Sequence, residues 1–133
     1  MKKMALATLL VFMALFLAWN VYAGTDGFGK ADTNKDGHIT KDEFESHVTS
    51  RFNEYDKNKD GKIDADELGA KKNPEAVKEF RFMDRNNDGF VNANEFYKAA
   101  LQRRDQIDFS RDQKISREEY NSNKALPFLQ FYF

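Results

Sequence analysis

The residues best suited to chemistry are oxygen-bearing side chains that recur in four segments of twelve residues. Each segment begins with Asp and ends with Glu: residues 32–43 (DTNKDGHITKDE), 56–67 (DKNKDGKIDADE), 84–95 (DRNNDGFVNANE) and 108–119 (DFSRDQKISREE). Their starts lie 24, 28 and 24 residues apart, which is the spacing of an internal repeat. Hard cations such as Ca²⁺ take about six to eight oxygen ligands. The sequence therefore indicates cation binding.

The first three segments share one pattern, D-x-N-x-D-G-x-[IV]-x-x-x-E, without exception. This pattern resembles the EF-hand family, and the repeat extends through almost everything after Ala31. The resemblance implies an all-α fold of four EF-hand helix-loop-helix units, with short β-bridges between paired loops. It also implies Ca²⁺ as the bound ion, with up to four ions per chain. We refer to the segments in chain order as loops 1 to 4.

The family pattern assigns a role to each loop position. Side-chain oxygens at positions one, three and five, a backbone carbonyl at position seven and a bidentate Glu at position twelve surround the ion. Position nine contributes directly or through a water, and Gly at position six permits the positive φ of a sharp turn. The implied ligands are Asp32, Asn34, Asp36, His38, Thr40 and Glu43 in loop 1; Asp56, Asn58, Asp60, Lys62, Asp64 and Glu67 in loop 2; Asp84, Asn86, Asp88, Phe90, Asn92 and Glu95 in loop 3; and Asp108, Ser110, Asp112, Lys114 and Glu119 in loop 4.

Loop 4 departs from the pattern at two positions. Ser110 stands at position three and Gln113 at position six, where the other loops have Asn and Gly. A residue other than Gly at positive φ costs about 1–2 kcal/mol, which corresponds to about one decade of affinity. Arg104 also replaces the Phe that is expected four residues before the loop. We therefore predict that loop 4 is the weakest site.

Apolar residues recur at fixed positions around the loops and predict the core. They stand four residues before a loop, at position eight within it, and directly after it, where we expect them to open the next helix. The three sets are Phe28, Phe52 and Phe80; Ile39, Ile63, Val91 and Ile115; and Phe44, Leu68, Phe96 and Tyr120.

The connections between the loops predict how the loops pair. Residues 44–55 and 96–107 are single twelve-residue connections, each long enough for one helix of about 18 Å. Loops at opposite ends of one rigid helix cannot lie side by side. The middle connection contains Gly69, Asn73 and Pro74, and Asn73 can cap a helix that begins at Pro74. We therefore expect loop 2 to pair with loop 3, and loop 1 with loop 4.

This spacing is similar to that of lanmodulin, a family that binds lanthanide ions much more tightly than Ca²⁺. Lanmodulin loops have Pro at position two, whereas the present loops have Thr33, Lys57, Arg85 and Phe109. That family also favours Asp at position nine, which only Asp64 provides. Ca²⁺ is therefore the predicted ion, and a lanthanide ion is the alternative.

The first residues resemble a secretory signal. Lys2 and Lys3 precede a largely apolar run, and Val21-Tyr22-Ala23 is suited to cleavage by a signal peptidase. An uncleaved membrane anchor is the alternative. We predict a signal peptide at 1–23, a four-EF-hand domain at 24–125 and a secreted or periplasmic location. The chain has no Cys, so an exported form must be held together by its core, by bound metal, or by both.

The composition narrows the possible functions. The net charge of −1 does not suggest a nucleic-acid-binding surface. The only His residues are His38 and His47, which with the lack of Cys leaves no catalytic constellation, so we expect no enzymatic activity. We expect a Ca²⁺ buffer, sensor or metal-stabilised adaptor, with membrane contact only through the signal segment. A calmodulin-like switch with one dedicated partner is an alternative, although Met83 is the only Met after the signal segment.

The last eight residues form an aromatic tail that the EF-hand pattern does not explain. Residues 126–133 (LPFLQFYF) contain four aromatic side chains and two Leu. Left exposed, such a segment promotes aggregation. We expect it to fold back into the groove between the helices as an internal plug. A docking peptide for a membrane or for a protein partner is the alternative.

Overall fold

The computed structural model describes residues 26–133, so the predicted signal peptide at 1–23 lies outside the described residues. The helices are α2 (Gly27–Ala31), α3 (Lys41–Tyr55), α4 (Pro74–Met83), α5 (Ala93–Ile107), α6 (Arg117–Asn123) and α7 (Leu129–Tyr132). The strands are β1 (His38–Ile39), β2 (Lys62–Ile63), β3 (Val91–Asn92) and β4 (Ile115–Ser116). The predicted helical fold with short β-bridges is confirmed. No helix within residues 26–133 has the length and apolar character needed to cross a bilayer.

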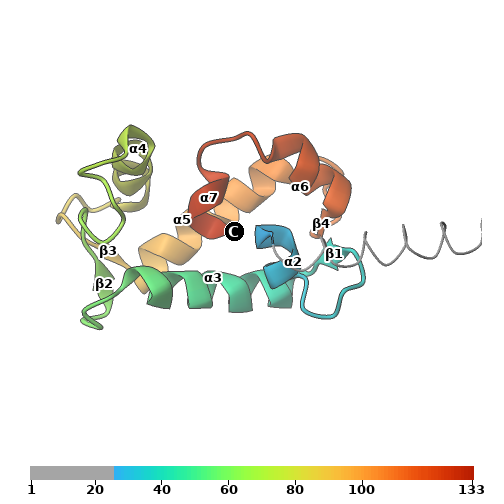
Figure 1. Ribbon diagram of the computed structural model, residues 1–133, viewed down its shortest axis with the longest axis horizontal. Helices are drawn as coiled ribbons and strands as arrows, with labels where there is room; N and C mark the ends of the chain where they lie inside the picture. The colour runs from blue at the N-terminus through green and yellow to red at the C-terminus, as the bar shows by residue number, and fades with distance from the viewer. Residues whose placement is uncertain (1–25) are drawn as a thin grey trace, which may run out of the picture.

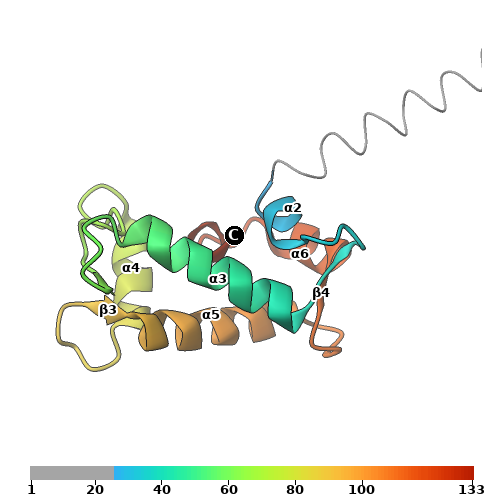
Figure 2. The same ribbon diagram turned by 90° about the horizontal axis from the view of Figure 1, so that it is seen from below.

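The strands pair the loops as the connection lengths predict. β1 pairs antiparallel with β4, with Ile39 opposite Ile115, and β2 pairs antiparallel with β3, with Ile63 opposite Val91. The two pairs lie at opposite ends of the molecule, joined by α3 and α5 (Figure 1). Figure 2 shows α3 and α5 running alongside each other between these ends. Each of these two helices therefore connects loops of different pairs.

Local capping interactions explain where the long helices begin. The Thr40 hydroxyl accepts the Glu43 N–H while the Glu43 carboxylate accepts the Thr40 N–H, which is a capping box at the start of α3. Asn92 and Glu95 form the same box at the start of α5. The Asn73 side chain accepts the Glu75 N–H at 3.0 Å, so α4 begins at Pro74 as predicted. Position nine of loops 1 and 3 thus positions the Glu at position twelve.

The prediction of a helix directly after loop 2 is wrong. Residues 65–72 form turns, because a single helical turn ends at Gly69, which has φ +83°. The Ala70 N–H donates to the Ala65 carbonyl at 2.8 Å and the Gly69 N–H donates to the Asp66 carbonyl at 3.0 Å. These two bonds form a Schellman motif, in which a left-handed Gly stops a helix. Leu68 is nevertheless buried, so its predicted place in the core is correct.

The core consists of the predicted apolar positions together with the tail. The residues before the loops and at position eight are all buried, as are Phe44 and Phe96, whereas Tyr120 is half-buried. The tail contributes the buried residues Leu129, Phe131 and Tyr132. Figure 1 shows α7 beside α3 and α5, and the contacts between α3 and α7 agree. The predicted internal plug is therefore confirmed, and the tail belongs to the same core as the EF-hand units.

Candidate metal centres

All four loops adopt the same backbone turn. Positions four and six have positive φ in every loop. The position-four residues are Lys35, Lys59, Asn87 and Arg111, with φ of 60°, 59°, 56° and 59°. The position-six residues are Gly37, Gly61, Gly89 and Gln113, with φ of 87°, 83°, 85° and 67°. Gln113 therefore takes the left-handed conformation that its place in the repeat predicts, at the steric cost of a side chain there.

The Asp at position one is buried and ties the loop together. Its carboxylate accepts the N–H of position six in each loop, and the side chain is 6–7 % exposed in all four. The N···O distances are 3.1, 2.9, 3.0 and 3.0 Å for Asp32, Asp56, Asp84 and Asp108. This bond brings the two sides of the turn together and places a buried carboxylate inside it.

The residue at position three separates loop 4 from the others. In loops 1 to 3 the Asn side-chain oxygen accepts the N–H of position five at 2.8–2.9 Å. In loop 4 the Ser110 hydroxyl instead donates to the Asp108 carboxylate at 3.2 Å. Positions one and three are thus bonded to each other in loop 4, whereas in loops 1 to 3 the Asn amide donates to the Asp of position five at 3.0–3.1 Å. An ion must compete with a bond between two predicted ligands in every loop.

The Glu at position twelve spans its loop. In loop 1 one oxygen of Glu43 accepts the Asn34 N–H and the other accepts the Thr40 N–H, both at 3.0 Å. Glu119 makes the corresponding bonds to Ser110 and Ser116 in loop 4. Burial on its own raises the pKa of Glu43, but the N–H donors of Thr40 and Asn34 lower the pKa overall to about 2. The carboxylate is therefore ionised at neutral pH and available to a cation.

The donor atoms fit a hard cation such as Ca²⁺. The Asp32 Oδ1 oxygen is buried and has no hydrogen-bond partner, which is unusual for a carboxylate unless a cation or water contacts it. In residues 26–133, no three His, Cys, Asp or Glu side chains form a group that could hold an ion by themselves. The predicted ligand sets also use amide, hydroxyl and carbonyl oxygens. The Glu at position twelve must exchange its N–H partners for the ion when it closes the site.

Residues beside the strands add further contacts between paired loops. The Arg117 N–H donates to the Gly37 carbonyl at 3.3 Å, which joins loop 4 to loop 1. At the other end the Lys62 ammonium lies 4.9 Å from the centre of the Phe90 ring, so the two position-seven residues of loops 2 and 3 are in contact. The two loops of each pair are therefore in direct contact.

The structure adds a buried polar cluster that the sequence analysis missed. Glu79 accepts the Tyr132 hydroxyl at 2.6 Å and binds Arg103 through two bonds of 3.0 and 2.7 Å. Burial and the Glu79 carboxylate raise the pKa of Tyr132, so its hydroxyl stays protonated and donates. The cluster fastens α7 to α4 and α5. One sequence feature could have indicated that Glu79 is buried. It lies at helical spacing from Ala76 and Met83, on the buried face of α4.

His47, the one imidazole outside the loops, does not approach a metal centre. Its ring stacks on Phe133 of the tail with centroids 6.0 Å apart, and its Nε2 atom is buried without a hydrogen-bond partner. Burial lowers the pKa of His47, which favours the neutral ring. His47 therefore packs against the tail, away from the predicted metal ligands.

The substitution Gln113→Gly is expected to strengthen ion binding at loop 4 by about tenfold, because it removes the steric cost of a left-handed side chain. Calorimetric titration of the variant with Ca²⁺ measures the gain. The matched control is Gly61→Gln in loop 2, where an added Cβ meets no atom within 4 Å, so only the φ of +83° opposes it. The control should lose about tenfold. If loop 4 binds Ca²⁺ equally tightly in Gln113→Gly and in the parent protein, and loop 2 does so in Gly61→Gln and in the parent protein, φ does not limit binding.

Comparison with known families gave two matches. Residues 45–101 match an EF-hand domain pair, and residues 26–49 match an EF hand. The matched ranges include loops 1 to 3 and end before loop 4. Comparison with curated proteins gave no significant match. The chain therefore contains EF-hand domains, a class of domain that binds calcium ions and is typically non-enzymatic.

Proposed function

We propose that this EF-hand chain binds Ca²⁺ through all four loops, most weakly through loop 4. The main support is the shared loop geometry, in which every loop has positive φ at positions four and six. In every loop the buried Asp of position one also accepts the N–H of position six. A Ca²⁺ shell requires the oxygens of positions one, three and five to surround one ion, and we infer that the shared turn allows them to do so. The proposed ligands are the residues that the EF-hand pattern assigns to each loop.

We propose Ca²⁺ rather than a lanthanide ion because the ligand sets contain few carboxylates. Trivalent ions favour additional carboxylates, and only loop 2 has a fourth carboxylate among its ligand positions, supplied by Asp64. The Asp64 carboxylate accepts the Glu67 N–H at 2.8 Å, so the extra charge lies at the start of the turn that carries the closing Glu. A lanthanide ion is the second candidate, favoured by the lanmodulin-like loop spacing.

We further propose that the protein acts outside the cytoplasm as a Ca²⁺ buffer, a sensor or a metal-stabilised adaptor. The signal-like segment at 1–23 supports export. A calmodulin-like capture of partner helices is less well supported. The buried tail residues Phe131 and Tyr132 already occupy the space beside α3 and α5, where a partner helix would insert. One dedicated partner is compatible with this arrangement.

Parallel calorimetric titrations of the ion-free protein with Ca²⁺, Mg²⁺ and La³⁺ test the choice of ion. We expect Ca²⁺ to bind more tightly than Mg²⁺, because the loops supply flexible oxygen shells and Mg²⁺ demands near-ideal octahedral geometry. We expect La³⁺ to bind only modestly more tightly than Ca²⁺. A preference for La³⁺ of several decades would contradict the Ca²⁺ proposal and support the lanthanide candidate.

The substitution Glu67→Gln is expected to weaken Ca²⁺ binding at loop 2 by about 100-fold, or about 2.7 kcal/mol, because it removes the charge of the closing ligand. The matched control is Asp66→Asn, which removes one exposed carboxylate from the neighbouring position without touching the predicted shell. Titration of both variants separates the two effects. An unaltered titration for Glu67→Gln, or an equal loss in Asp66→Asn, would contradict the assigned role.

A further inference from the structure

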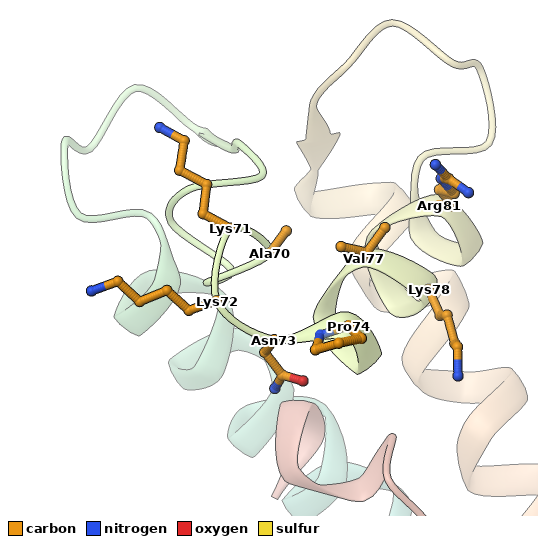
Figure 3. Close-up of a pocket in the computed structure, with 8 residues that line it drawn as sticks. All are labelled: Ala70, Lys71, Lys72, Asn73, Pro74, Val77, Lys78 and Arg81. Carbon is orange, nitrogen blue, oxygen red and sulfur yellow. The ribbon is translucent and has the colours of Figure 1, made fainter.

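A cleft lined by cationic side chains lies between the turn at residues 65–73 and α4, outside the predicted metal ligands. Its volume is about 460 Å³. The floor includes Ala70 of the turn and Val77 of α4, and the rim carries two cations from each side (Figure 3). We call it the basic cleft and define it by Ala70, Lys71, Lys72, Val77, Lys78 and Arg81. A second hollow of about 370 Å³ shares four of these residues and extends the apolar floor to Phe80.

The rim retains positive charge that the protein does not neutralise. Lys71 pairs with Asp66, and Lys78 pairs with Glu75 at 2.8 Å, both as exposed ion pairs. Exposed pairs of this kind are worth little and exchange readily. Within residues 26–133, no carboxylate lies at ion-pair distance from Lys72 or Arg81. An anionic occupant therefore meets two cations without partners and two that are weakly held.

The arrangement of the cations determines the shape of the occupant. Figure 3 shows Ala70 and Val77 facing each other across the cleft. Lys71 and Lys72 extend from the turn, whereas Lys78 and Arg81 extend from the helix. Because the four cations lie on two walls and do not converge, one small anion cannot contact them all. An extended chain with several carboxylates can, and the floor between the walls accepts an apolar side chain.

We propose that the basic cleft docks an acidic peptide segment in which one apolar side chain is flanked by carboxylates. The apolar group packs on Ala70 and Val77, and the carboxylates pair with Lys72 and Arg81. An anionic bilayer fits the cleft less well, since Ala70 and Val77 are only half-exposed and lie between long cationic side chains. This binding site is separate from ion binding by the loops.

Fluorescence anisotropy of a labelled peptide, Gly-Glu-Glu-Leu-Glu-Glu-Gly, titrated with the purified protein in Ca²⁺ buffer tests the proposal. We expect saturable binding that weakens as salt is raised. The double variant Lys72→Glu/Arg81→Glu should weaken binding by about tenfold or more. The matched control Lys98→Glu/Lys124→Glu carries the same charge change on exposed positions of α5 and at the end of α6, and should stay within about twofold. A peptide with Ser in place of Leu should bind several-fold more weakly.

Three results would overturn the proposal: no saturable peptide binding, an equal loss in the two double variants, or binding only to phosphatidylserine vesicles. Circular dichroism of each variant shows whether its helices are retained. If charge reversal disturbs folding, Lys72→Gln/Arg81→Gln carries the same test with a smaller change. Calorimetric Ca²⁺ binding is measured on the same samples. If peptide binding is absent while Ca²⁺ binding is kept, the cleft proposal fails and the proposed function stands. If Ca²⁺ binding is absent while peptide binding is kept, the proposed function fails and the cleft proposal stands.

Discussion

Addition of Ca²⁺ to the ion-free protein is expected to raise its free energy of unfolding by several kcal/mol. An ion that binds only the folded state stabilises it by about 2.7 kcal/mol per site at one hundred times the dissociation constant. Three loops at that saturation would contribute about 8 kcal/mol. The expected rise in melting temperature is about 20 °C or more for a domain of this size. Helicity should rise as well, because the ion relieves repulsion among the carboxylates of each loop.

Thermal unfolding followed by far-ultraviolet circular dichroism measures this effect. The necessary control is NaCl at matched ionic strength, because salt also screens repulsion between carboxylates. Glu67→Gln should lower the Ca²⁺-dependent gain by roughly one site's contribution while leaving the ion-free melting temperature nearly unchanged. An identical rise with NaCl, or no rise with Ca²⁺, would mean that the loops do not stabilise the fold through bound ions.

The substitution Tyr132→Ala is expected to destabilise the Ca²⁺-loaded protein by about 3–5 kcal/mol. Tyr132 is fully buried, and its ring lies 5.5 Å from that of Phe96 between centroids. Its removal leaves a cavity in the core and takes one hydrogen bond from the buried Glu79. The same gap should increase the binding of a hydrophobic dye, as should deletion of residues 126–133.

Urea unfolding of Tyr132→Ala and Tyr132→Phe separates the two parts of that loss. The Phe variant keeps the ring, and Glu79 keeps both of its bonds to Arg103, so we expect a cost of only about 1–2 kcal/mol. A wild-type unfolding midpoint and unchanged dye binding in Tyr132→Ala would contradict the role of the tail as part of the core.

The loop pairing could be predicted from the sequence because it depends on a local property. Twelve residues between two loops allow one helix, and a rigid helix keeps its two ends apart. The start of α4 could also be predicted locally, since Asn73 and Pro74 are adjacent signals for a helix start. Gln113 was assigned positive φ from its place in the repeat alone, and it has φ 67°.

The features that sequence reasoning missed depend on tertiary contacts or on competing local signals. Leu68 occupies the same place in the repeat as Phe44, but Gly69 follows it and stops the helix after one turn. The Glu79–Tyr132 bond joins residues 53 apart in the chain, and nothing local in either segment identifies the partner. The basic cleft likewise arises only because the turn after loop 2 folds against α4.

Equilibrium dialysis of the purified protein against buffered Ca²⁺ tests the central claim most directly, because it counts bound ions without depending on a conformational signal. The loop geometry predicts three ions per chain at moderate Ca²⁺ concentration, with a fourth only at higher concentration because Gln113 has a side chain at positive φ. Retention of no Ca²⁺ beyond that of the surrounding buffer, by a protein with intact helices, would contradict it.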